Sequence, residues 1–378
     1  MVKPNIIVIT VDGMRWNDLG ATGNSVVRTP NLDALASHGL CFTQAVADRP
    51  HARLHTKSTA SDGPAEVVGT LLSRLGDAGY ATGVVGSVAI PESLGAMQQL
   101  VGVDGSPDDY LEWVNHESPS SPSGGMPPEE AQHVTTWIGN QAVRFCQSAI
   151  EPFVLVAGFP APSEPPMPWR TMYDPKALDP GSGVPPGTAT DSAKKCLGLH
   201  YGAIGHMDRQ VGRLLATLTG RGRTNNVFIL TSTKGAYLGD HGLFEEESGP
   251  LYDALLRVPL LVGGLLGQRK GETDPALVTM ADVSATLLDV LQLDTSSLSD
   301  SRSFTAQLHR SGLPHRKVVA IQGRNGQQAL RTARYKWIQG PGQDGEALYD
   351  LQADPDEAVN IIDTRRALAI RKMLTGLE

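Results

Sequence analysis

The stretch PNIIVITVDG at residues 4–13 decides the fold of this 378-residue chain. It is a continuous run of apolar, mostly β-branched residues that stops at a carboxylate, Asp12. Such a run is typical of a strand that is buried on both faces of a parallel sheet. Ligands of open α/β sheets bind beyond the carboxyl ends of the strands. We therefore expect Asp12 to lie at the edge that holds the functional site.

Further motifs follow in an order that covers almost the whole chain. They include TPNLDALASHGL at 29–40, FTQA at 42–45, NVFILTS at 226–232, LGDHGL at 238–243 and LRVPL at 256–260. Together these motifs resemble the sulfatase family of the alkaline phosphatase superfamily. The resemblance implies an α/β fold with a large, mostly parallel sheet flanked by helices. It also implies a small C-terminal subdomain with an antiparallel sheet.

The composition of the chain suggests where this architecture divides. We expect a sulfatase-like α/β domain over 1–295, a linker over 296–317 and a C-terminal α+β subdomain over 318–378. The segments 118–128 and 160–188 are rich in Pro, Gly and Ser and are predicted to be loops. The second is long enough to act as a lid. Its larger side chains would either reach a ligand or anchor the loop: Trp169, Arg170, Tyr173 and Lys176.

The resemblance also implies a catalytic centre, and this chain departs from it. Family members hold a divalent cation, usually calcium, with oxygen ligands that include two adjacent carboxylates at the first strand. Here Asp12 is followed by Gly13, and the family's Ser-Asp-His-Gly is replaced by STKG at 232–235. The ammonium of Lys234 has no acceptor and cannot coordinate a cation. We therefore expect no metal and no other cofactor, and we expect Lys234 to take the cation's place and pair with Asp12.

The family's nucleophile is also missing from the position where the resemblance places it. It is made by oxidising a Cys or Ser within Cys-x-Pro-x-Arg, but the aligned segment RPHARLHTKST at 49–59 contains no Cys. The three cysteines of the chain lie elsewhere, at Cys41, Cys146 and Cys196. The segment instead carries two histidines four residues apart, which would share one face of a helix. These histidines are His51 and His55, and they are accompanied by side chains that favour an anion or offer a hydroxyl: Arg53, Thr56 and Lys57.

These residues define the candidate site. We predict catalytic roles for Asp12, His51, His55, Lys234 and His241, and ligand binding by Arg53, Thr56 and Lys57. The leading hypothesis is a metal-independent reaction on a polar or anionic small molecule, because His can act as an acid or base near neutral pH. Two alternatives stay open. One is a non-catalytic pseudoenzyme that binds a ligand or a protein, and the other is an active sulfuric or phosphoric ester hydrolase with an unconventional site.

The amino-acid composition limits the classes of partner that the chain is expected to bind. Asp and Glu number 40 against 32 Lys and Arg, and this acidic balance argues against a nucleic-acid surface. No apolar stretch has the length of a membrane span, so we expect no membrane partner. The first strand begins close to Met1 and the cysteines are few, which predicts a cytoplasmic protein without a signal peptide or disulfides. A protein partner or a homo-oligomer is left open.

Overall fold

The computed structural model describes residues 3–50, 64–88, 99–102, 130–244, 249–264, 266–296, 298, 300–324, 326–340 and 345–377. Within these residues, eight strands form one sheet in the order β4-β3-β5-β1-β6-β7-β2-β8. All neighbouring strands run parallel except at β7, which is antiparallel to both β6 and β2. The strands are β1 (Asn5–Val11), β2 (Gly39–Val46), β3 (Ala81–Gly86), β4 (Gln99–Gly102), β5 (Phe153–Phe159), β6 (Asn226–Thr231), β7 (Leu260–Gly264) and β8 (Glu272–Thr279).

Strand β1 lies at the centre of this sheet, as its apolar run predicts. It pairs in parallel with β5 and β6, and every one of its residues is buried. Alternate side chains of a strand point to opposite faces. Ile7 and Ile9 therefore pack into the core on one face of the sheet, whereas Ile6 and Val8 pack into the core on the other face.

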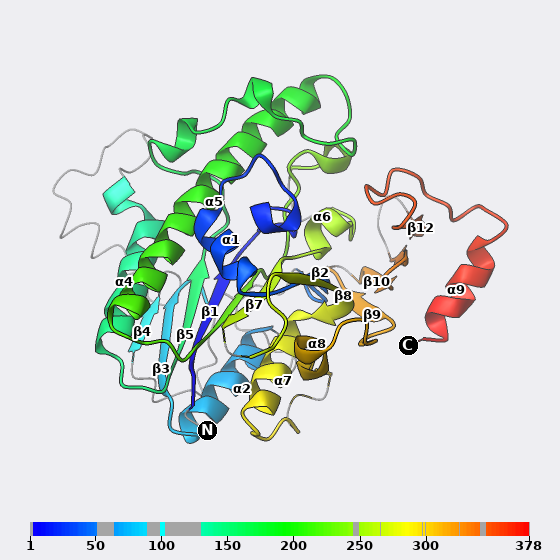
Figure 1. Cartoon of the computed structure of the whole chain (residues 1–378). Helices are drawn as coiled ribbons and strands as arrows, with labels where there is room; N and C mark the ends of the chain where they lie inside the picture. Colours follow the sequence, from blue (N-terminus) through cyan, green and yellow to red (C-terminus); the bar gives the residue numbers. More distant parts are fainter. Residues whose placement is uncertain are drawn as a thin grey trace.

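Helices cover both faces of the sheet (Figure 1). The longest is α5, which runs for 33 residues and crosses one face beside α4. The helices are α1 (Pro30–Ser37), α2 (Pro64–Asp77), α4 (Val134–Ser148), α5 (Thr188–Gly220), α6 (Asp253–Leu256), α7 (Met280–Val290), α8 (Thr305–His309) and α9 (Ala367–Thr375). Short 3-10 turns are η1 (Gly20–Thr22), η2 (Glu130–Gln132), η3 (Trp169–Thr171), η4 (Pro175–Ala177) and η5 (Asp240–Gly242).

A second, antiparallel sheet lies beside the body and is followed by α9 (Figure 1). Its strands are β9 (Val319–Gln322), β10 (Gln328–Arg331), β11 (Tyr335–Gln339) and β12 (Ala347–Asp350). One face, with Ile321 and Ile338, packs on Leu256 and Leu277 of the body. The other face packs on α9 through Trp337. This sheet is thus enclosed between the body and the last helix.

The predicted fold class is confirmed: a large, mostly parallel sheet flanked by helices is followed by a small C-terminal antiparallel sheet. The division at residues 295 and 318 stays a prediction. The long segment over 160–187 is largely irregular, as expected, and contains η3 and η4. No helix among the described residues is long and apolar enough to cross a membrane.

Candidate functional site

Asp12, Thr233 and Lys234 meet where strands β1 and β6 end. These strands are neighbours, and Thr10 pairs with Thr231, so the residues that follow each strand emerge side by side. The hydroxyl of Thr233 donates a hydrogen bond to Oδ1 of Asp12 at 2.7 Å. The Nζ atom of Lys234 lies 4.0 Å from the same oxygen. The expected pairing of Asp12 with Lys234 is confirmed, and both side chains remain accessible, at 24% and 19% exposure.

Ser232 holds these two strand ends together. Its hydroxyl faces the carbonyl oxygens of Val11 and Lys234 and can donate to one of them at a time. It also accepts a hydrogen bond from the backbone N–H of Met14 at 3.3 Å. Ser232 is fully buried, so these bonds replace water for a polar group that water cannot reach. The positions of Asp12 and Lys234 therefore rest on a fixed backbone.

This group of side chains does not fit a divalent cation. Calcium takes six to eight oxygen ligands at about 2.3–2.6 Å. The described residues at the strand ends offer one carboxylate, Asp12, and one hydroxyl, Thr233, while Gly13 offers no side chain. A cation on Asp12 would also lie close to the ammonium of Lys234 and be repelled by it. Among the described residues, no cluster of three or more His, Cys, Asp or Glu side chains is placed to hold a metal.

A small cavity of about 60 Å³ lies under this edge, on the face that α2 and α7 cover. Thr10, Thr231 and Thr233 line it from the sheet, while Asp48 and Arg49 line it from the end of β2. The hydroxyl of Thr10 is buried and has no hydrogen-bond partner within the described part of the chain. The cavity thus combines hydroxyl groups and the charged side chains of Asp48 and Arg49 with apolar side chains, and Thr233 connects it to the Asp12 group.

Arg15 connects the loop after β1 to the loop after β6. Its guanidinium forms an ion pair with Asp240 and also donates to the carbonyl oxygen of Ala236 at 2.8 Å. Its backbone N–H donates to Asp18, which also pairs with the buried ring of His200 at 2.6 Å. Asp240 additionally accepts a hydrogen bond from the backbone N–H of Leu238, within its own turn. These bonds fix the wall of the site next to Lys234.

His241 lies in the turn η5 and joins three parts of the molecule. Its ring stacks on Tyr252 with the centroids 3.8 Å apart. Its backbone N–H donates to the carbonyl oxygen of Gly183 in the long loop. The backbone of Asp356, beside the C-terminal sheet, lies close enough to the ring to raise its pKa. Burial lowers the pKa of His241, against the raising effect of Asp240. These contacts hold the long loop in place, and a catalytic role for His241 stays a prediction.

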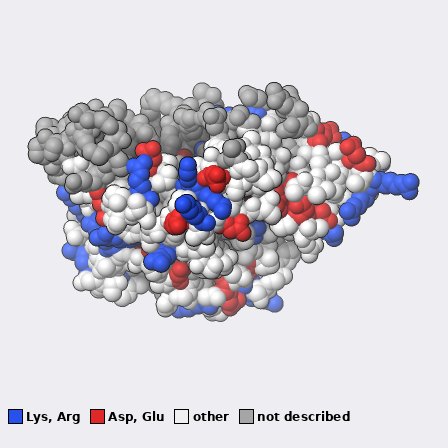
Figure 2. Space-filling model, turned by 90° about the horizontal axis from the view of Figure 1, so that it is seen from above, with Lys and Arg blue, Asp and Glu red and all other residues white. Residues whose placement is uncertain are grey.

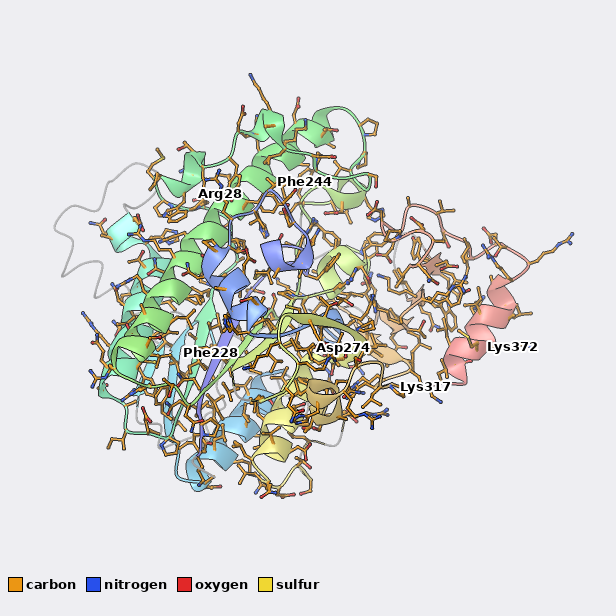
Figure 3. The ribbon with its side chains drawn as sticks, viewed as in Figure 1. Arg28, Phe228, Phe244, Asp274, Lys317 and Lys372 are labelled. Carbon is orange, nitrogen blue, oxygen red and sulfur yellow. The ribbon has the colours of Figure 1, made fainter. Side chains whose placement is uncertain are left out.

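Two aromatic side chains anchor the long loop to α5. The ring of Trp169 stacks on His206, and Tyr173 packs edge-on against Tyr201. The hydroxyl of Tyr173 also accepts a hydrogen bond from the backbone N–H of Arg28 at 2.9 Å. The sequence leaves two roles open for these aromatic side chains, contact with a ligand and anchoring of the loop. Their contacts in the structure are those of loop anchors. Arg28 and Phe244 are both labelled near the upper loops in Figure 3.

A buried cluster of charges connects the site to the C-terminal sheet. Asp253 of α6 accepts hydrogen bonds from Arg331 at 2.7 and 3.0 Å and from Lys336 at 3.0 Å. Lys336 also lies 2.5 Å from Glu357. Burial opposes the charged form of Asp253, but Arg331 and Lys336 outweigh burial and hold its pKa well below the usual range. Burial raises the pKa of Glu357 to about 7, against the lowering effect of Lys336.

The described part of the chain therefore brings together only some of the predicted site. Asp12 and Lys234 are in contact, while His241 lies in the neighbouring turn. The remaining predicted residues lie outside the described residues and stay predictions: His51, Arg53, His55, Thr56 and Lys57. On the face seen from above in Figure 2, basic and acidic side chains are interspersed over the part that is described.

Comparison with known proteins finds matches that extend over almost the whole chain. The sulfatase family model matches residues 4–293. An arylsulfatase from Clostridium perfringens is 26% identical over 96% of this chain and 91% of that protein. The solved phosphonate monoester hydrolase of Agrobacterium radiobacter has a TM-score of 0.79 at 19% identity, over 99% of this chain and 95% of that one. Another solved protein, in complex with its substrate D-glucosamine-2-N,6-O-disulfate, has a TM-score of 0.73 at 20% identity. The match covers 99% of this chain and 96% of that one.

Proposed function

The chain belongs to the sulfatase family, and from this premise we propose that it binds an anionic small-molecule ester at the carboxyl edge of its large sheet. The ligand class is a sulfate or phosphate-type ester of a polar molecule. The observation that carries the proposal is the position of Lys234, whose ammonium lies beside Asp12 where the parallel strands end. That edge is where open α/β sheets bind their ligands.

Lys234 supports anion binding because it supplies a positive charge that belongs to the protein itself. Asp12 lies on one side of the ammonium and is itself held by Thr233, and the side chain of Lys234 keeps 19% of its surface accessible. An ammonium with three donors can bind Asp12 and still donate to an ester oxygen. The hydroxyl groups that line the neighbouring cavity can bind the uncharged part of such a ligand.

Hydrolysis of the bound ester is the second candidate function. The relatives favour it, since an arylsulfatase and a phosphonate monoester hydrolase are both named for ester hydrolysis. Thr233 adds a local observation, because its hydroxyl donates to a carboxylate, the arrangement of a hydroxyl beside a base. The metal-independent reaction favoured by the sequence also depends on His51 and His55, which lie outside the described residues, and it stays a prediction.

Calorimetric titration tests the proposed ligand class. The probes are D-glucosamine-2-N,6-O-disulfate and 4-nitrophenyl sulfate, with unsulfated glucosamine as the negative control. We expect saturable binding of the sulfated probes and at least a tenfold weaker affinity in Lys234→Met, which keeps the length of the side chain but removes its charge. Lys372→Met on α9 removes the same charge from an exposed position and should bind as the wild type does. Equal affinity in Lys234→Met would refute the proposal.

The same probes separate binding from hydrolysis. Release of 4-nitrophenol or inorganic sulfate by the wild type, but not by Asp12→Asn, would establish ester hydrolysis at this edge. Binding without release under the same conditions would leave binding as the function. The assay is run with added calcium and again with a chelator, so that a contribution from a cation is detected directly.

A further inference from the structure

A second pocket lies at the junction between the body and the C-terminal sheet. It has a volume of about 580 Å³ and is referred to here as the junction pocket. Its walls come from the end of β2, from the segment over 300–317 and from the first residues of β9. Neither Asp12 nor Lys234 lines it. The side chains that matter for its charge are Asp48, Arg49, Asp300, Arg302, Arg316 and Lys317.

Basic side chains outnumber acidic ones in this pocket. Four of the six are cationic, although the chain as a whole carries a formal net charge of −8. Arg316 is neutralised by the buried carboxylate of Asp282, which accepts from its guanidinium at 2.5 and 2.8 Å. Arg302 and Lys317 are exposed, and neither side chain has a carboxylate partner within the described part of the chain. Their charges are therefore available to an anion.

Asp282 also holds the backbone of the pocket in place. It accepts a hydrogen bond from the backbone N–H of Arg302 at 2.7 Å, in addition to those from Arg316. The ring of His315 lies 3.9 Å from it and faces two carbonyl oxygens, those of Leu277 and Arg302. The cations are thus presented on a fixed backbone, which lowers the entropy lost when a ligand binds.

The opposite wall is fixed as well. The backbone N–H of Gln322 in β9 donates to the carbonyl oxygen of Asp48 at 2.9 Å, which ties the second sheet to the end of β2. Burial raises the pKa of Asp48, against the lowering effect of Arg49. Asp48 and Arg49 also line the small cavity under the sheet edge, so the two hollows share a wall.

We propose that the junction pocket binds the phosphate or sulfate group of an anionic small molecule through Arg302, Lys317 and Arg49. A guanidinium presents two parallel donors to such a group, and the ammonium adds a third charge-assisted hydrogen bond. In Figure 3, Lys317 lies between the body of the molecule and α9, at the lower edge of this junction. Because neither Asp12 nor Lys234 lines the junction pocket, substitutions at Lys234 test the two sites separately.

Titration with inorganic sulfate and inorganic phosphate tests this site, with sodium chloride used to keep the ionic strength constant. The wild type should bind at least one of the two anions saturably. Arg302→Ala combined with Lys317→Ala should weaken that binding at least tenfold, and Lys317→Glu alone should weaken it further than Lys317→Ala does. The matched control, Lys195→Ala with Arg221→Ala, removes the same charge from exposed positions of α5 and its end and should bind as the wild type.

Lys234→Met distinguishes this proposal from the function proposed for the sheet edge. Anion binding that survives in Lys234→Met and is lost in the Arg302 and Lys317 double variant supports the junction pocket. Binding that is lost in Lys234→Met and retained in the double variant places the anion at the sheet edge and overturns the junction pocket. Binding that weakens equally in the α5 control is a general charge effect and also overturns the proposal. The proposal is likewise overturned if the folded wild-type protein shows no saturable anion binding.

Discussion

The Nζ atom of Lys234 lies 4.0 Å from Oδ1 of Asp12, at the ends of two neighbouring parallel strands. In this arrangement a carboxylate at the sheet edge is balanced by a covalently attached cation. Thr233 donates to the same carboxylate oxygen and completes the group. The positive charge at the centre of the site is therefore supplied by Lys234, and it should not depend on the concentration of a divalent ion.

Lys234→Ala should destabilise the protein because it leaves Asp12 without its cation. The pair is partly exposed, so solvent screening limits the expected loss to about 1 kcal/mol of unfolding free energy. Chemical denaturation of the variant and the wild type measures it. Lys372→Ala, on the exposed side of α9, is the control and should unfold as the wild type does. An unfolding midpoint that does not move in Lys234→Ala would show that the pair contributes nothing to stability.

Changing His51 and His55 together to Ala should abolish ligand binding while the fold stays intact. The prediction follows from their spacing of four residues in the basic segment beyond β2. Binding is measured with the sulfated probes, and folding is followed by circular dichroism. The double variant His38→Ala with His309→Ala removes two exposed histidines elsewhere and should bind normally. Undiminished binding in the first double variant would remove these histidines from the site.

Lys336→Met should cause a large loss of stability. Lys336 is fully buried between the carboxylates of Asp253 and Glu357. Removing one partner from a buried charge cluster costs about 3–5 kcal/mol, because an uncompensated charge remains inside the protein. Arg334→Ala is the comparison, since its pair with Asp350 is exposed on the arginine side and should contribute much less. Equal losses in the two variants, measured by urea denaturation, would contradict this account of the cluster.

Stability should decrease as the pH rises from about 4.5 to about 7. Burial raises the folded-state pKa of Glu357 to about 7, above the ordinary value of 4.5. Between these two values the folded state binds more protons than the unfolded state, so the unfolding free energy falls as pH increases. Glu357→Gln removes the titrating group and should flatten this part of the profile. A wild-type profile that rises over this range, or a variant profile of unchanged slope, would contradict the assignment.

The sequence predicts the architecture well because the fold depends on local patterns. The apolar run at 4–13 identifies β1, and its position at the centre of the sheet follows from burial on both faces. The pairing of Asp12 with Lys234 is also predictable, since each residue follows a strand and the two strands end at the same edge of the sheet. A carboxylate and an ammonium at one sheet edge are expected to meet.

The contacts that hold the site together could not be predicted in the same way. Arg15 pairs with Asp240, which lies 225 positions away in the sequence, and Asp253 of α6 meets Arg331 and Lys336 of the second sheet. No local pattern reports such contacts, because they depend on how elements that are distant in the sequence pack together. The hydrogen bond from Thr233 to Asp12 was missed for a simpler reason: a Thr at a strand end usually has no polar role that the sequence reveals.

The metal content of the purified protein tests the central claim most directly. The protein is dialysed against calcium and magnesium, freed of loosely bound ions and analysed for its elements, with Lys234→Ala and Asp12→Asn treated in parallel. We predict no stoichiometric divalent ion in the wild type, because the ammonium of Lys234 lies beside the one carboxylate that the described strand ends offer. One calcium or magnesium ion per chain that is lost in Asp12→Asn would contradict the account and restore a metal centre at this edge.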